Sequence, residues 1–85
     1  MPRALLAVWL DVPGDERDGA LAEWTGRRAR LESEGCQYWV FESSTRPGRF
    51  LEFTEASDAG ALRAARANAG LARADDDLYL QVELR

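Results

Sequence analysis

Residues 37–54, with the sequence QYWVFESSTRPGRFLEFT, decide the fold of this chain. Two runs of aromatic and branched residues, 38–41 and 50–53, favour extended strands. Between them lies the segment 44–48, where proline and glycine supply the geometry of a tight turn. The stretch therefore predicts a β-hairpin, with strands over 37–43 and 49–54.

Helical patterns flank this hairpin on both sides. Before it, apolar residues recur at helical spacing from Leu21 to Leu31, after an acidic first turn. Gly35 follows as a left-handed cap. After the hairpin, Ser57 or Asp58 is expected to cap an alanine-rich second helix. The hairpin is therefore predicted to lie between two helices along the chain.

Strands complete the pattern at both ends. Residues 4–12 are dense in Leu, Val and Trp and stop at a Pro-Gly pair. Residues 78–85 alternate apolar and polar side chains, as a half-buried strand does. The resulting order, β-α-β-β-α-β, is the ferredoxin-like arrangement of the α+β class. We expect one domain over 1–85, an antiparallel sheet with both helices on one face.

The other face of this sheet is expected to be uncovered within one chain. If the turn pairs Ser44 with Arg49, strand alternation turns Val40, Leu51 and Phe53 toward the helices. The open face then carries Trp9, Trp39, Phe41, Phe50, Glu52, Thr54 and Tyr79. A slip of one residue in the hairpin would exchange the two sets. An aromatic surface of this kind indicates either a homodimer interface or a dimer that also keeps a ligand pocket.

Composition excludes several classes of function. The chain has no His and one Cys, which excludes Ser-His-Asp and Cys-His catalysis and makes a metal site unexpected. A net charge of −4 disfavours nucleic acid, and the arginines within 27–30 are expected on a solvated helix face. No apolar run reaches the roughly 18–20 residues of a membrane span. Lacking any sign of disulfide bonding, the protein is expected in the cytoplasm.

Some side chains of the open face could carry chemistry. Trp9 and Trp39 could stack on an aromatic ligand, or pack in the core of a dimer. Glu52 could accept a proton from a phenolic substrate, or pair with an arginine as an ordinary strand residue. Tyr38 and Tyr79 could donate a hydrogen bond to a ligand oxygen, or be ordinary amphipathic residues at an edge. If the protein is an enzyme, Glu52 or Tyr79 is expected to handle the proton as the catalytic residue. Phe41, Phe50 and Thr54 complete the candidate ligand-binding set, whereas Trp24 is expected in the core.

Residues 48–62, with the sequence GRFLEFTEASDAGAL, carry a family resemblance. Together with the element order, they resemble the antibiotic biosynthesis monooxygenase-like family of the dimeric α+β barrel superfamily. In this resemblance Thr54 stands where the family's strand-end Glu lies, with Glu52 and Glu55 beside it. The resemblance implies two sheets packed into a barrel across a two-fold axis, with a pocket in each subunit between the sheet and the helices or loops.

The same resemblance implies a function. Characterised enzymes of that family oxidise phenolic or quinol-type aromatics with oxygen, using neither metal nor flavin. We therefore expect a small homodimeric protein that binds a small aromatic or polyketide-type compound and oxidises it without a cofactor. The alternative is a non-catalytic module for ligand binding or dimerisation.

Overall fold

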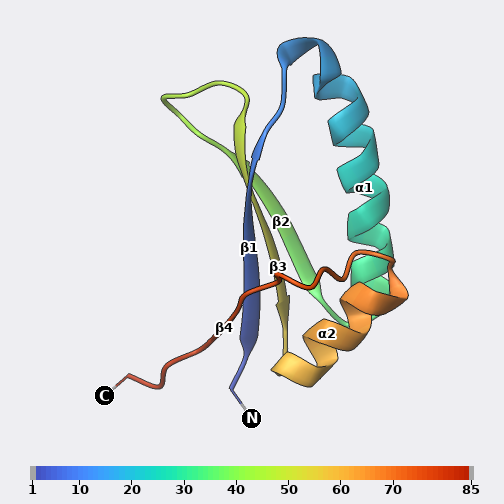
Figure 1. Ribbon diagram of the computed structural model, residues 1–85, viewed down its shortest axis with the longest axis vertical. Coiled ribbons are helices and arrows are strands. Elements are labelled where there is room, and N and C mark those ends of the chain that lie inside the picture. Colours follow the sequence, from blue (N-terminus) through green and yellow to red (C-terminus); the bar gives the residue numbers. More distant parts are fainter. Residues whose placement is uncertain (1, 85) are drawn as a thin grey trace.

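Four antiparallel strands form one sheet, and both helices cover the same face of it (Figure 1). The computed structural model describes residues 2–84. Its elements are β1 (Ala4–Asp11), a short 3₁₀ turn (Gly14–Glu16), α1 (Arg17–Ser33), β2 (Gln37–Glu42), β3 (Arg49–Ala56), α2 (Ala59–Asn68) and β4 (Leu78–Leu80). The strand order is β2-β3-β1-β4, so β1 and β3 are central. This is the ferredoxin-like α+β fold that the sequence predicts.

The helix boundaries follow the expected signals. After α1, Gly35 has a φ of +84°, which a residue with a side chain rarely adopts. At the start of α2, the carboxylate of Asp58 accepts a hydrogen bond from the backbone nitrogen of Ala61 at 2.8 Å. Leu31 and Leu62 bring one apolar anchor from each helix to the sheet, and both are fully buried. Both side chains belong to the hydrophobic core that the helices share with the sheet.

The register of the hairpin differs from the prediction by one residue. The backbone nitrogen of Ser43, not Ser44, donates to the carbonyl oxygen of Arg49 at 2.8 Å. The hydroxyl of Ser43 closes the longer turn by accepting from the backbone nitrogen of Arg46 at 3.1 Å. The carboxylate of Glu42 accepts from the nitrogen of Gly48 at 3.0 Å. These bonds close the loop over 44–48 with Ser43, rather than Ser44, opposite Arg49.

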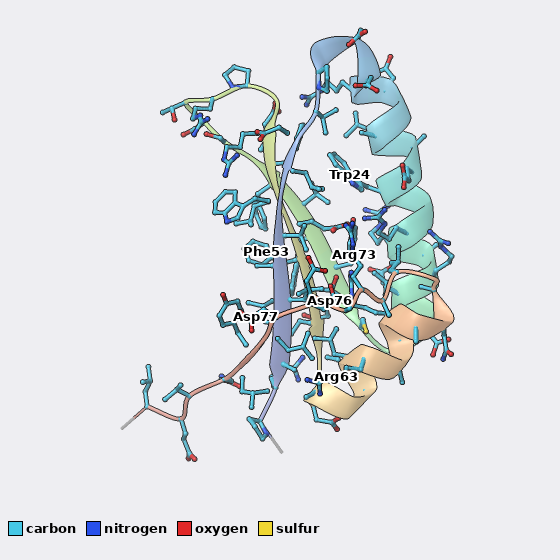
Figure 2. The ribbon with its side chains drawn as sticks, viewed as in Figure 1. Trp24, Phe53, Arg63, Arg73, Asp76 and Asp77 are labelled. Atoms are coloured by element: carbon cyan, nitrogen blue, oxygen red, sulfur yellow. The ribbon has the colours of Figure 1, made fainter. Side chains whose placement is uncertain are left out.

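This shift exchanges the faces of β3. Phe50, Glu52 and Thr54 face the helices and are buried, contrary to the expectation that they lie on the open face. Leu51 and Phe53 lie on the open face instead, opposite Phe41 and Trp39 of β2. The expected positions in β1 and β2 are confirmed, because their alternation does not depend on the turn. Figure 2 shows Phe53 and Trp24 on opposite sides of the sheet.

The last strand is shorter than predicted. β4 ends at Leu80, which pairs with Ala4, the first residue of β1. One further bond joins the nitrogen of Gln81 to the carbonyl oxygen of Arg3 at 2.8 Å. Residues 81–84 run past the start of β1 and are not part of a strand, and Val82 and Leu84 are exposed. Residue 85, the predicted strand end, lies outside the described residues.

Candidate functional site

A pocket of about 470 Å³ lies between the helix-covered face of the sheet, α1 and the segment that follows α2. Its apolar wall includes Val8, Leu10, Trp24 and Leu71. The charged side chains that line it are Asp11, Glu23, Arg27, Glu52, Arg66 and Arg73. An apolar concavity of roughly 300–1,000 Å³ with a few convergent polar groups is the usual form of a small-molecule site. This pocket therefore is the candidate functional site.

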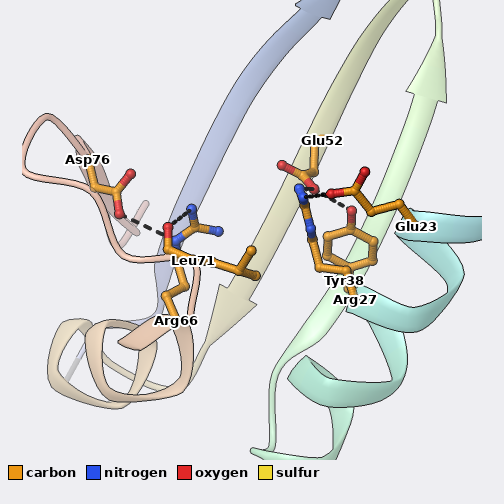
Figure 3. A network of polar contacts seen from close by, with 7 residues as sticks. All are labelled: Glu23, Arg27, Tyr38, Glu52, Arg66, Leu71 and Asp76. Carbon is orange, nitrogen blue, oxygen red and sulfur yellow. Dashed lines mark hydrogen bonds and ion pairs between the residues drawn. The ribbon is translucent and has the colours of Figure 1, made fainter. Parts of the chain in front are cut away.

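Glu52 forms the centre of a buried polar network in this pocket (Figure 3). Its Oε2 atom accepts a hydrogen bond from Nη1 of Arg27 at 2.6 Å and another from the hydroxyl of Tyr38. Arg27 also donates from Nη2 to Oε1 of Glu23 at 2.9 Å. Only 3 % of the Glu52 side chain is exposed. Both bonds reach the same oxygen, which leaves Oε1 without a hydrogen bond from any residue in 2–84.

Three elements place these groups together. Glu52 faces the helices because strand residues alternate, and it pairs with Val40 of β2. Tyr38 lies two residues before Val40 and therefore faces the same way. Arg27 follows Trp24 by three residues, so both lie on the face of α1 that covers the sheet. The network therefore depends on the register of β3 against β2 and on the rotation of α1.

Burial and charge fix the protonation of the two donors. Burial raises the pKa of Tyr38, and the hydrogen bond to the Glu52 carboxylate and its negative charge raise it further. Tyr38 is therefore a proton-bearing donor at neutral pH. Burial alone lowers the pKa of Arg27, but its hydrogen bond and ion pair with Glu52 outweigh this, and the net shift is upward. The carboxylate is thus held by a fixed phenol and a fixed guanidinium.

A second polar cluster closes the other end of the pocket. Arg66 of α2 donates from Nη2 to the carbonyl oxygen of Leu71 at 3.1 Å and from Nε to Oδ2 of Asp76 at 3.4 Å. The same Asp76 oxygen accepts from the backbone nitrogen of Arg73 at 3.0 Å. These bonds hold the segment after α2 against the helix. Leu71 and Arg73, both in this segment, line the pocket.

The structure divides the predicted site residues between the two faces of the sheet. Glu52 lines the pocket, Thr54 is buried beside it in β3, and Phe50 packs against Trp24 with ring centroids 4.8 Å apart. The other four are exposed on the open face: Trp9, Trp39, Phe41 and Tyr79. The set expected on one surface is therefore not one site. The functional roles assigned to its members stay predictions.

The open face is an aromatic surface of its own. Phe41 packs edge-on against Phe53 with ring centroids 5.6 Å apart. The guanidinium of Arg49 lies over the ring of Trp9 at 4.9 Å. Trp9 and Phe41 are nevertheless 60 % and 55 % exposed. Most of this aromatic area therefore remains in contact with solvent in one chain.

The sequence interpretation missed the arginines of the pocket. Arg27 belongs to a cluster expected on a solvated helix face, and only 17 % of its side chain is exposed. Arg66 was not singled out and is 5 % exposed. The available signal was helical spacing: Arg27 follows Trp24 by three residues and Arg66 follows Leu62 by four. A charged residue in step with a helix's apolar anchors faces the same way as they do.

No group of three side chains that could hold a metal ion occurs within residues 2–84. No helix in that range is both long enough and apolar enough to cross a membrane. The free thiol of Cys36 is buried under the helices, and this burial raises its pKa. None of these features adds a ligand group to the pocket.

A solved structure resembles the chain along nearly its whole length. It is a conserved protein of unknown function from Bacteroides thetaiotaomicron, described as a possible oxidoreductase. The two share 27 % identity with a TM-score of 0.66, and the match covers 94 % of each chain. No family model matches the sequence, and no curated protein matches it. The likeness supports the fold over almost the entire chain.

Proposed function

We propose that the pocket binds a small aromatic or polyketide-type compound and that the chain oxidises it with molecular oxygen, without metal or flavin. The observation that carries this proposal is the buried Glu52 carboxylate in the wall of a partly apolar pocket, held by Arg27 and Tyr38 with one oxygen unengaged. The resemblance to antibiotic biosynthesis monooxygenases supports the reaction class. The structural likeness to a possible oxidoreductase of 27 % identity also supports it.

The chemistry that fits these groups begins with a proton transfer. Glu52 accepts the hydroxyl proton of a phenol that lies along Trp24 and Leu10, and the adjacent Arg27 stabilises the phenolate. An electron-rich phenolate reduces oxygen directly, so no protein-bound redox group is required. For a phenol with a free para C–H, the overall reaction consumes one O₂ and gives the para-quinone and one water. Tyr38 keeps the carboxylate in position.

A second candidate is ligand binding without oxidation. Arg27 and Tyr38 both bond to Oε2 of Glu52, so two protein donors already hold this carboxylate in a fixed position. The chain also lacks His, which removes the usual alternative base. On this reading Glu52 and Arg27 orient a hydroxyl-bearing ligand and hold it unchanged.

Oxygen consumption separates the two candidates. The assay supplies a panel of naphthols and quinols under air and follows oxygen uptake together with quinone absorbance. Glu52→Gln is expected to lower uptake about 100-fold, the usual minimum for losing a general base. The matched control is Glu42→Gln, because Glu42 also pairs with an arginine of α1, Arg17, but does not line the pocket.

Each outcome of this assay decides something. Uptake that survives Glu52→Gln removes the carboxylate from the mechanism. Absence of uptake with every compound, together with calorimetric binding that Glu52→Gln weakens, favours the non-catalytic module. An equal loss of oxygen uptake in Glu52→Gln and Glu42→Gln indicates that the substitutions change folding rather than the chemical step.

We also propose that two copies pair through the open sheet face. The exposed aromatic area described above supports this, since contiguous apolar surface on a small chain usually marks an interface. Native mass spectrometry at micromolar concentration is expected to give twice the mass of the chain. Trp39→Lys should give the mass of one chain, whereas Ala22→Lys, at an exposed position of α1, should leave the doubled mass unchanged. A single mass for the unchanged protein would refute the pairing.

A further inference from the structure

The Arg66 end of the pocket holds a buried donor that no protein group satisfies. Arg66 is 5 % exposed, and its Nη1 atom has no hydrogen-bond partner within residues 2–84. The other two nitrogens bond to Asp76 and to the carbonyl oxygen of Leu71. Leaving a charged donor buried and unpaired is costly, so such a group usually has a partner supplied from elsewhere.

The free nitrogen is turned toward the interior of the pocket. In Figure 3 it points away from Asp76, toward the side on which Glu52 and Arg27 lie. Arg66 is among the residues that line the pocket, and so are Arg27 and Glu52 at the opposite end. A ligand in this pocket therefore meets the Glu52 carboxylate at one end and the unpaired Nη1 of Arg66 at the other. The Nε atom of Arg27, at the Glu52 end, is also buried without a hydrogen-bond partner within residues 2–84.

The charges at this end favour an anion. Arg66 and Arg73 contribute two positive charges, and the carboxylate that bonds to this cluster is that of Asp76. At the Glu52 end, by contrast, Arg27 is shared between two carboxylates, Glu52 and Glu23. Arg66 keeps one N–H free for an anion, and a guanidinium forms its strongest hydrogen bonds with carboxylates.

We propose that Arg66 is a specificity-determining residue that binds a carboxylate of the ligand, so that the pocket selects aromatic acids over their neutral analogues. This inference rests on the proposed binding of an aromatic compound in the pocket. The carboxylate of the ligand accepts a hydrogen bond from Nη1 of Arg66, and the hydroxyl group of the ligand contacts Glu52. Asp76 competes with the ligand for the same guanidinium.

Two probes of nearly equal shape test this assignment. They are a hydroxynaphthoate and its uncharged primary amide, titrated calorimetrically into the full chain at fixed salt. The acid is expected to bind about tenfold more tightly than the amide, the size of one charge-assisted hydrogen bond. Arg66→Gln should bring the ratio of the two dissociation constants to about one by removing that bond. Arg63→Gln, an exposed arginine of the same helix, should leave the ratio unchanged.

A variant with the opposite effect keeps the test independent of folding. Asp76→Asn removes the competing charge while its amide oxygen can still accept from the nitrogen of Arg73. The preference for the acid is the dissociation constant of the amide divided by that of the acid. It should then rise by about threefold, because Arg66 has lost its anionic partner. This result supports the inference even if Arg66→Gln does not fold, and an unchanged or lower ratio in Asp76→Asn overturns it.

The remaining outcomes distinguish this inference from the proposed function. Equal affinity of the wild-type chain for acid and amide overturns the carboxylate subsite and leaves the pocket in place. Absence of binding for both probes overturns the pocket as an aromatic site, and the subsite with it. Oxygen uptake is measured separately and depends on Glu52, so loss of oxidation with a preserved acid preference refutes only the reaction.

Discussion

Replacing Tyr38 with Phe removes one oxygen from the buried network and leaves the aromatic ring in place. The lost group is a hydroxyl that donates to a carboxylate, and bonds to charged groups contribute about 1.5–3 kcal/mol. Glu52 keeps its bond from Arg27 to the same oxygen, so the carboxylate is not left without a partner. We therefore expect the lower end of that range, about 1.5 kcal/mol. For a chain of this size, that is a fall of roughly 6–12 °C in Tm.

Urea unfolding at neutral pH measures this difference. The midpoint should fall while the slope stays constant, because the surface exposed on unfolding hardly changes. Tyr79→Phe is the matched control, since Tyr79 is 57 % exposed and should change stability by less than about 0.5 kcal/mol. Protein concentration is held fixed, because pairing of chains would add to the apparent stability.

A double-mutant cycle tests the reasoning behind the magnitude. If the hydroxyl acts through the carboxylate, Tyr38→Phe should cost less once Glu52→Gln is present, with a coupling of about 1 kcal/mol. Equal effects of Tyr38→Phe and Tyr79→Phe would show that the buried bond contributes nothing. A cycle with no coupling would show that Tyr38 is stabilised by packing alone, and the network would lose its role in positioning Glu52.

Three further predictions concern the stability of the fold. The pKa of Tyr38 is raised in the folded chain. Its contribution to stability is therefore present below the ordinary pKa of about 10 and is lost as the pH rises above it. In urea unfolding, the free energy of unfolding should fall more steeply with alkaline pH for the wild type than for Tyr38→Phe, and parallel declines would contradict this. Gly48→Ala should destabilise the chain by about 1–3 kcal/mol, because φ is +88° and a Cβ would lie 2.9 Å from the carbonyl oxygen of Val12. Gly26→Ala, inside α1 with no atom within 4 Å of the new Cβ, should instead raise the melting temperature.

The element order could be predicted from the sequence because each element carries its own local signal. Asp58 caps α2 and Gly35 ends α1, as their types suggest, and the alternation of β1 gives its two faces correctly. The hairpin register could not be predicted in the same way. It depends on whether Ser43 or Ser44 opposes Arg49, and the bonds that decide this come from the side chains of Ser43 and Glu42.

The one-residue shift in the pairing of β2 with β3 limits how much of the site could be predicted. The residue type of Glu52 predicts the acid-base candidate, but pairing Ser44 with Arg49 would place it among the exposed aromatic residues. Its partners come from other elements: Tyr38 lies across the sheet, and Arg27 comes from α1. Pairings of this kind between distant residues depend on helix rotation and strand register together. The spacing of Arg27 after Trp24 was the one local signal that pointed inward.

The corrected register also separates two proposals that the sequence had joined. Glu52 and Phe53 are neighbours in β3, yet one lines the pocket and the other faces the open side of the sheet. The pocket is lined by residues of β1, β3, α1, α2 and the segment after α2, on the helix-covered side of the sheet. The open face carries no part of the Glu52 network, so its aromatic residues need a different explanation, which pairing provides. A substitution on either face of β3 therefore tests one proposal without disturbing the other.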